Sequence, residues 1–420
     1  MRQTAHIIRS LKHPAEVERL RAIYGKGFFL IGVSAPRADR LHNLSDVRDF
    51  PRSAAQRLLD KDSAEDETFG QQTRDTFHLA DAYVRVRTQR KDQADNHLRR
   101  IVDLVLSHPF LPPTRDEYAM FMAYAASLRS ADLSRHVGAV IVDRNGDIIG
   151  TGANDVPRAE GGPYWADPDD FWPERSEVGG PDYVRGFDSN ERERDAIVSK
   201  VIRAVVPDEP GTPAEVVERY RKRLEDTGLL DLTEFGRAVH AEMSALLACA
   251  RTGVSPRGAT LFCTTFPCHN CTKHLVEAGI TRVLYVEPYP KSKALALHND
   301  AVVLPDEEER PVDDHDRRVR YEPFTGIGVR RFLDLFSLGM GSGRPIRRKA
   351  KRASGARVQW EHAEHSAPRL PLDPRSYLER EHAAAHKVDK IERKAGMVAR
   401  SASSVDESRA DDEGPSSDVR

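Results

Sequence analysis

Two short motifs, separated by one predicted helix and one predicted strand, constrain this sequence more than any other feature. The first reads H-x-E at His240 and Glu242, and the second reads P-C-x-x-C at Pro267, Cys268 and Cys271. One imidazole and two thiolates bind Zn²⁺ and leave its fourth tetrahedral position open to water. The metal lowers the pKa of that water towards about 7, and a carboxylate that is not a ligand then carries protons. We therefore predict a catalytic zinc site with His240, Cys268 and Cys271 as ligands and Glu242 as the general acid and base.

The residues around both motifs predict that the ligands stand at the beginnings of two helices. Residues 259–264 form an apolar, β-branched run that is typical of a buried strand. Residues 268–279 follow a proline and end on a glycine, as helices commonly do, and residues 240–250 form a second apolar helical run. A helix N-terminus favours thiolate over thiol, which suits both cysteines as metal ligands.

A C-x-x-C pair also occurs in structural zinc sites and in redox centres. A structural site needs four protein ligands, but Cys249 and Cys263 lie within apolar segments and have the character of small core residues. A redox pair has no use for the H-x-E motif. The catalytic interpretation accounts for both motifs together.

Composition narrows the class of protein. The chain has 420 residues, enough for two or three domains, and its net charge of −2 provides no overall basic field for nucleic acid. Its four cysteines, two of them assigned to the metal, argue against a disulfide framework. We find neither a signal peptide nor an apolar stretch long enough to cross a membrane, and we expect a soluble, cytoplasmic protein.

The patterns divide the chain into three parts. Residues 1–106 predict an α/β domain, with a helix over 14–24, a fully buried strand of a parallel sheet over 28–33, and mostly helix over 77–106. Residues 115–336 carry the zinc motifs and include an aromatic, Gly- and Pro-rich insertion over 157–189. Residues 339–420 form a charged tail that we expect to be largely disordered, with one helix near 377–395.

Within residues 115–336 the order of elements resembles a known fold. A helix over 116–129, a strand over 137–142, an Asn-Gly turn and a strand over 148–153 precede the insertion; helix, strand, helix and a strand over 282–286 follow it. This order resembles the cytidine deaminase-like fold, a three-layer α/β/α domain. Phe266 before the P-C-x-x-C motif is similar to deoxycytidylate deaminases, whereas tRNA adenosine deaminases usually carry Glu there. The resemblance implies that Asn154 binds the substrate sugar and that Arg135 occupies a family position.

Three further segments resemble the bacterial anti-phage deoxycytidine-nucleotide deaminases, namely FLIGVSAPR at 29–37, GQQTRDTFHLAD at 70–81 and EPYPKSKA at 287–294. Those proteins join a P-loop kinase-like domain to a deaminase domain and remove dC nucleotides from replicating phage. The resemblance implies a partial kinase-like domain over residues 1–106. The G-x-x-x-x-G-K-[ST] phosphate loop is absent from this sequence. We therefore expect no ATP or GTP hydrolysis, and either a start upstream of Met1 or a member that lost the loop.

We therefore predict hydrolytic deamination of dCMP or dCTP to the deoxyuridine nucleotide and ammonia. Glu242 passes protons to N3 and to the departing amine while hydroxide attacks C4. Arg135, Lys291 and Lys293 are candidates for the phosphate contacts. We expect the deoxycytidine nucleotide, a nucleotide effector and further copies of the chain as partners, and no motif supports an RNA regulator.

Two other functions remain open. A deaminase of RNA or single-stranded DNA uses the same zinc chemistry on an unpaired base, and the basic segments 85–100 and 344–352 fit such a substrate, although the neutral net charge does not. A nucleotide sensor without turnover is the third hypothesis, and the presence of Glu242 argues against it.

Overall fold

A six-stranded mixed sheet forms the centre of the molecule, in the order β4-β3-β5-β6-β8-β7. The structure, a computed structural model, describes residues 5–64, 73–166, 169, 179–224, 227–289, 292–308, 312–313, 315–339, 344–350, 355–370, 378–388, 390–391 and 393. β3 pairs antiparallel with β4 and with β5, whereas β5, β6, β8 and β7 run parallel. The strands are β3 Gly138–Val142, β4 Ile148–Ala153, β5 Thr260–Thr265, β6 Arg282–Glu287, β7 Val302–Val303 and β8 Val319–Pro323.

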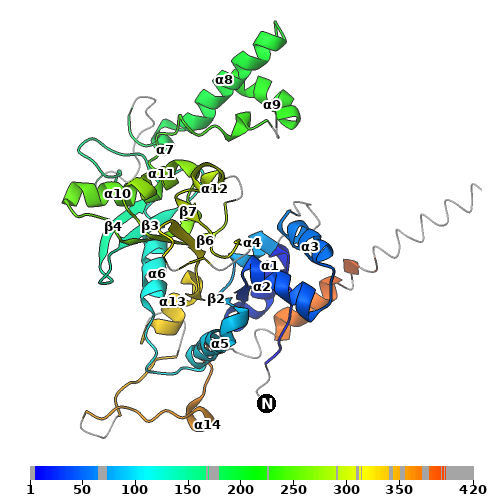
Figure 1. The fold of residues 1–420 in the computed structure, drawn as a ribbon, viewed down its shortest axis with the longest axis vertical. Coiled ribbons are helices and arrows are strands. Elements are labelled where there is room, and N and C mark those ends of the chain that lie inside the picture. The colour runs from blue at the N-terminus through cyan, green and yellow to red at the C-terminus, as the bar shows by residue number, and fades with distance from the viewer. Residues whose placement is uncertain are drawn as a thin grey trace, which may run out of the picture.

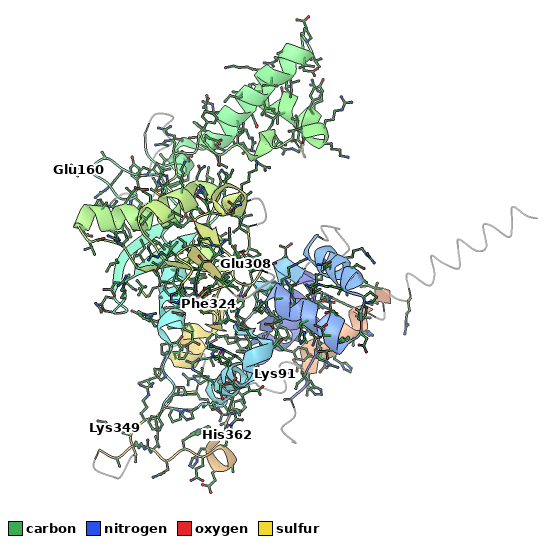
Figure 2. All side chains as sticks on the ribbon, in the orientation of Figure 1. Lys91, Glu160, Glu308, Phe324, Lys349 and His362 are labelled. Carbon is green, nitrogen blue, oxygen red and sulfur yellow. The ribbon has the colours of Figure 1, made fainter. Side chains whose placement is uncertain are left out.

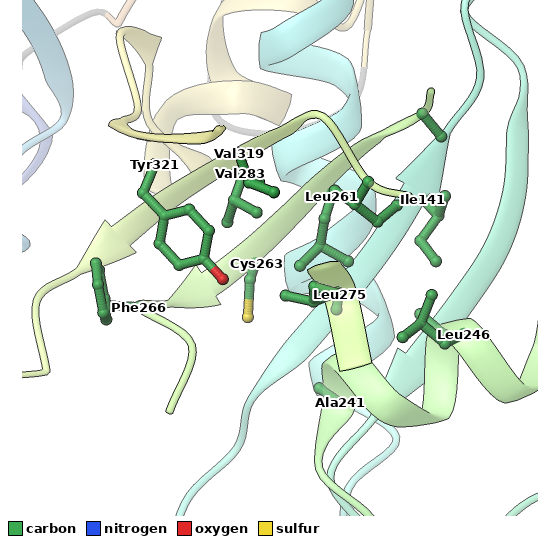
Figure 3. Packing of buried hydrophobic residues seen from close by; sticks show 14 of the residues in the cluster. Ile141, Ala241, Leu246, Leu261, Cys263, Phe266, Leu275, Val283, Val319 and Tyr321 are labelled. Atoms are coloured by element: carbon green, nitrogen blue, oxygen red, sulfur yellow. The ribbon is translucent and has the colours of Figure 1, made fainter. Parts of the chain in front are cut away.

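Helices cover both faces of this sheet, so the domain has three layers (Figure 1). One face packs against α6 (Arg115–Ser127), and the other against α10 (Ala241–Thr252), α11 (His269–Glu277) and α12 (Ala294–His298). The side chains of β5 alternate between the two cores: Leu261 and Cys263 face α10 and α11, while Phe262 faces α6. Figure 3 shows the first of these cores. The predicted cytidine deaminase-like α/β/α fold is confirmed.

Glycines allow the helices to approach the sheet closely. A Cβ atom on Gly152 of β4 would lie 2.1 Å from the Ala241 carbonyl oxygen, and one on Gly138 of β3 would lie 1.9 Å from the Ala123 carbonyl oxygen. Any side chain at these positions would push α10 or α6 away from the sheet. Because α10 begins directly after His240, the absence of a side chain at Gly152 helps to set the position of a metal ligand.

A smaller three-stranded sheet, in the order β1-β2-β9, organises the N-terminal part. β1 (Ile31–Ser34) pairs parallel with β2 (Ala82–Arg85), as the sequence predicts for a strand here. β1 is an edge strand and Val33 is 60% exposed, so the expectation of a fully buried strand is wrong. The surrounding helices are α1 Pro14–Tyr24, η1 Gly25–Gly27, α2 Arg37–His42, η2 Asn43–Val47, α3 Arg52–Ala64, α4 Thr73–Phe77, η3 Thr88–Arg90 and α5 Lys91–Val105.

The central strand of the small sheet, β2, interrupts the segment 77–106 that the sequence predicts as mostly helical. Helix is present over Lys91–Val105, but residues 82–84 are buried in the sheet between β1 and β9. β9 (Gly326–Ile327) comes from the chain that follows β8, and α13 (Val329–Phe336) comes after it. The N-terminal part and the large domain therefore share one sheet. Phe324 lies near this junction (Figure 2), and its ring contacts Tyr83 of β2 at a centroid distance of 5.7 Å.

The segment between β4 and α10 is longer than the insertion that the sequence analysis delimits. Asp155 and Val239 form an isolated bridge that closes it at its base. It contains α7 (Asp182–Arg185), η4 (Leu229–Asp231) and an arm of two helices, α8 (Ser189–Val205) and α9 (Pro213–Leu224), which projects from the domain in Figure 1. Residues 167–168 and 170–178 of the predicted insertion lie outside the described residues.

Parts of the C-terminal segment pack against the N-terminal part. The Arg369 backbone N–H donates to the Val105 carbonyl at 2.7 Å, and Ser107 Oγ donates to the Ala367 carbonyl at 2.8 Å. His362 of the short helix α14 (His362–His365) contacts Asp103 of α5 at 2.6 Å (Figure 2). Residues 378–388 are helical, within the range where the sequence predicts a helix. None of the described helices has the length and apolar character needed to cross a membrane.

Candidate metal centre

His240 is placed by the end of β4 and by the start of α10. The residue before it, Val239, exchanges two backbone hydrogen bonds with Asp155, at 2.9 and 3.3 Å. His240 is the N-cap residue of α10, with an extended backbone at φ −59° and ψ 150°. The two constraints hold the imidazole at the carboxyl end of β4, where its ring keeps contact with solvent.

The two cysteines are placed by the turn between β5 and α11. Cys268 is the N-cap residue of α11, and its Sγ accepts a hydrogen bond from the Cys271 backbone N–H at 3.4 Å. Cys271 follows in the first helical turn and is 1% exposed. Both sulfurs thus lie at a helix N-terminus, as the sequence predicts, where free N–H groups favour a negatively charged ligand.

The three side chains meet at one point. The Nδ1 atom of His240 lies 3.4 Å from Cys268 Sγ and 3.4 Å from Cys271 Sγ, and the three ligand atoms all lie within 4.8 Å of one another. Tetrahedral Zn²⁺, with its usual bond lengths to sulfur and nitrogen, places such atoms roughly 3.6 Å apart. One nitrogen and two sulfurs at this spacing therefore fit a zinc ion, and Nδ1 is the ring nitrogen that faces it.

The charges of these groups are coupled. Hydrogen bonding from the Cys271 thiol, and then from the His240 imidazole, lowers the pKa of Cys268 to about 4. The hydrogen bond to Cys268 in turn raises the pKa of His240 to about 9. The pKa of Cys271 is raised well above its ordinary value, first by its hydrogen bond to Cys268 and then by burial. A negative sulfur is thus already favoured at Cys268, which is the state that a metal ligand requires.

Glu242 is a buried carboxyl group beside the three ligands. It lies in the first turn of α10 and is 5% exposed. Burial raises its pKa, whereas the nearby His240 charge acts in the opposite direction. A carboxyl group held this way takes up a proton more readily than an exposed one. Its place next to the cluster fits the predicted role in proton transfer.

Asn154 lies at the end of β4, as the resemblance implies, and is 8% exposed. Its Oδ1 accepts from the Val137 N–H at 2.7 Å, and its Nδ2 donates to the Arg135 carbonyl at 2.5 Å. A carboxamide has two donor hydrogens and two acceptor lone pairs, so capacity for one further partner remains on each atom. Asn154 thus holds the 135–137 segment against the end of β4.

The three residues predicted to contact the phosphate are exposed or lie outside the described residues. Arg135 and Lys293 are exposed, and Lys291 lies outside the described residues. Ser292 lies between Lys291 and Lys293 and ties this segment to residues 266–272, which we call the zinc loop, because its Oγ donates to the Pro267 carbonyl at 2.9 Å. Neither Ser292 nor Ser130, whose Oγ donates to the Asn154 carbonyl at 2.6 Å, is predicted from the sequence. A lone serine carries no spacing signal that would indicate either contact.

Comparison with known proteins finds relatives over the part of the chain that holds this site. Residues 113–287 match the model of the cytidine and deoxycytidylate deaminase zinc-binding region. The chain is 31% identical over 177 residues to a deoxycytidylate deaminase of Enterobacteria phage T4, which covers 41% of this chain and 77% of that protein. It is 42% identical over 65 residues to the ComE operon protein 2 of Bacillus subtilis (strain 168), covering 15% of this chain and 34% of that protein. A crystal structure of the dCMP deaminase from the cyanophage S-TIM5 in complex with dCMP and dUMP covers 51% of this chain and 99% of its own, at 20% identity and a TM-score of 0.28.

The chain therefore belongs to the cytidine and deoxycytidylate deaminase family. It is a zinc-dependent deaminase, and His240, Cys268 and Cys271 form the group of ligand side chains that could hold the metal in the part of the matched region that the structure describes.

Proposed function

We propose that this chain removes the exocyclic amine of dCMP by hydrolysis and releases dUMP and ammonia. The observation that carries the proposal is the meeting of His240, Cys268 and Cys271 within 4.8 Å, with the buried carboxyl of Glu242 two residues beyond the histidine. The relatives named deoxycytidylate deaminase support dCMP as the substrate class. Phe266, the residue directly before the P-C-x-x-C motif, is buried and packs against Tyr285 and Tyr321.

The residues of the chain divide the chemistry between them. When bound, Zn²⁺ supplies a water molecule whose pKa is lowered towards about 7, so that a nucleophile is available at neutral pH. Glu242 accepts a proton from the attacking water at its carboxylate and donates it to N3 of the base. It then accepts the second proton, from the hydroxyl group now bonded to C4, and donates it to the amine that leaves C4, so that water and cytosine yield uracil and ammonia. The raised pKa of its buried carboxyl suits a group that must hold a proton between these transfers.

The remaining contacts position the nucleotide. We assign the sugar to Asn154, whose amide keeps one donor hydrogen and one acceptor lone pair beyond its contacts with the 135–137 segment. We assign the phosphate to Arg135, Lys291 and Lys293, which supply positive charge on either side of the metal ligands in the sequence.

An ammonia-release assay with a substrate panel tests this function. Purified protein loaded with one zinc per chain is incubated separately with dCMP, dCTP, CMP, deoxycytidine and a cytosine-containing single-stranded oligonucleotide. We expect turnover of dCMP, dCTP or both, and a much slower reaction with the unphosphorylated nucleoside. Deamination of the oligonucleotide alone would contradict the proposal and support the nucleic-acid deaminase. Nucleotide binding without ammonia release would support the sensor.

We propose further that the activity depletes dC nucleotides in anti-phage defence, and that residues 1–106 are a partial P-loop kinase-like regulatory domain. The resemblance of segments 29–37, 70–81 and 287–294 supports this proposal, as does the parallel pairing of β1 with β2.

Phage should form fewer plaques on cells that carry the wild-type chain than on cells that carry Glu242→Gln. The dCTP pool of the wild-type cells should fall after infection, and an unchanged pool would contradict the role. Light scattering of the pure protein with and without nucleotides tests the expected homo-oligomer and effector.

A further inference from the structure

Tyr321 of β8 is a tyrosine in the core of the domain, close to the zinc loop. The residue has no exposed surface, and its ring contacts that of Phe266 at a centroid distance of 5.3 Å. Figure 3 shows its hydroxyl group directed into the buried cluster, on the side of Cys263, and not towards solvent. A tyrosine at such a position must find a hydrogen-bond partner for its hydroxyl group, since an unpaired buried donor is unfavourable.

That partner leads to a metal ligand. The Tyr321 hydroxyl donates to Thr272 Oγ1 at 3.0 Å, and Thr272 Oγ1 donates to the Cys268 carbonyl oxygen at 2.9 Å. The Thr272 backbone N–H donates to the same carbonyl, also at 2.9 Å. Thr272 is itself fully buried. Two hydrogen bonds thus form a chain, shielded from water, from β8 to the backbone of Cys268, and the backbone N–H of Thr272 adds a third bond to the same carbonyl.

Tyr321 therefore contacts the zinc loop on both sides of this cysteine. Its ring packs against Phe266, two residues before Cys268, and its hydroxyl acts through Thr272, four residues after it. Cys268 is the N-cap residue of α11, so the direction of its Sγ depends on how its own backbone is held. Groups that orient metal ligands in this way commonly raise metal affinity.

We propose that Tyr321 and Thr272 are positioning residues that hold Cys268 in its metal-binding orientation. The inference rests on the zinc site of the proposed function and assigns these two side chains a role in metal retention. Neither residue touches the substrate or donates an atom to the metal. They keep Cys268 Sγ turned towards His240 Nδ1 and Cys271 Sγ before the metal binds. Such preorganisation increases metal affinity.

The test is a zinc-affinity measurement by competition with a chromogenic chelator, using the full chain. Tyr321→Phe removes one oxygen atom, and Thr272→Val removes the link to the Cys268 carbonyl while it keeps the shape of the side chain. Each should weaken zinc binding about 10- to 100-fold. Thr272→Ser keeps the hydroxyl and should bind zinc within about threefold of wild type. Tyr285→Phe is the matched control, because Tyr285 also packs against Phe266, at 4.9 Å, but is not part of the hydrogen-bond chain.

A spectroscopic measurement separates positioning from a general loss of stability. In the Co²⁺-substituted protein, Tyr321→Phe and Thr272→Val should shift the thiolate-to-metal absorption band, whereas Tyr285→Phe should leave it unchanged. Zinc affinity within threefold of wild type for Tyr321→Phe, together with an unshifted band, would overturn the inference. So would a Tyr321→Phe protein that fails to fold even with zinc present, because the hydroxyl would then serve the core and not the ligand. A wild-type chain that binds no zinc would defeat the proposed function itself, which is a different outcome.

Discussion

Four cysteines of similar chemistry have different roles here because they occupy different places in their elements. Cys268 and Cys271 stand at the start of α11 with their sulfurs 3.4 Å from His240 Nδ1. Cys263 lies in the middle of β5 and Cys249 lies in α10, and both are fully buried. Burial raises the pKa of Cys263 well above its ordinary value, so its sulfur stays protonated and apolar. Cysteines at the start of a helix can therefore act as thiolate ligands, whereas cysteines within a helix or a strand pack in the core.

This difference predicts opposite outcomes for two substitutions of buried cysteines. Cys271→Ser should abolish stoichiometric zinc binding, since two protein ligands remain where at least three are needed. Cys263→Ser should keep about one zinc per chain and lose only some stability of the core. Metal analysis of the two purified variants by mass spectrometry measures the contrast. Loss of zinc from Cys263→Ser would show that the ligand set is wrong.

Glu242→Gln tests the proton carrier separately from the metal. The amide keeps the shape of the side chain but cannot accept and return a proton. We expect zinc content and thermal unfolding close to wild type, and a fall in kcat of about 10²- to 10⁴-fold, which corresponds to about 3–5 kcal/mol in the barrier. Ammonia release from dCMP measures the rate, and Glu277→Gln in the last turn of α11 is a control without a role in the site. A variant that retains more than about a tenth of the wild-type rate is incompatible with general acid–base catalysis by this residue.

At the scale of elements, the distance between α10 and β4 determines where the metal ligand stands. The Cβ of Gly152→Ala would lie 2.1 Å from the Ala241 carbonyl oxygen and 2.4 Å from the Ala245 N, both of them backbone atoms. The helix must therefore move, and overpacking of this kind commonly costs about 1–3 kcal/mol. Because His240 caps this helix, we expect weaker zinc binding together with a lower free energy of unfolding.

Chelator competition and urea unfolding measure the two effects of Gly152→Ala. Gly339→Ala is the matched control, since a Cβ there has no atom within 4 Å, and it should change neither quantity. Unaltered zinc affinity in a folded Gly152→Ala protein would mean that α10 and its cap move independently.

The sequence predicts the elements around the site better than those of the N-terminal part. The helices that carry His240 and the cysteines have end signals of their own, and β5 has the composition of a buried strand. β2 has only four residues and β9 only two. β9 also lies more than 240 positions after β2 in the chain. Such short strands have no periodicity to read, and their pairing depends on contacts remote in sequence. The α8–α9 arm is likewise not predicted, because α8 opens with a run of polar and charged residues and its apolar residues, Val198 and Ile202 among them, lie in its second half.

At the scale of the molecule, one buried carboxylate joins the N-terminal part to the large domain. Glu117 of α6 has a side chain with no exposure, and it binds Arg100 of α5 with two hydrogen bonds of 2.7 and 2.8 Å. Its oxygens also accept from the Ile327 N–H of β9 at 2.8 Å and from the Thr114 N–H at 2.7 Å. Elements from both parts thus meet at one side chain, which is fully paired.

Glu117→Ala should therefore destabilise the whole molecule and not only one helix. It leaves the Arg100 guanidinium and two backbone N–H groups without their acceptor, and the loss of one partner of a buried pair costs about 3–5 kcal/mol. Urea unfolding measures this loss. Glu218→Ala, which breaks an exposed pair with Arg221 within the arm, should cost at most about 1 kcal/mol.

Hydrogen exchange adds a local readout: the amides of β2 and β9, paired through Ala82 and Ile327, should exchange faster in Glu117→Ala while those of β5 change less. Equal effects of the two substitutions would show that other contacts, such as the packing of Tyr83 against Phe324, hold the parts together.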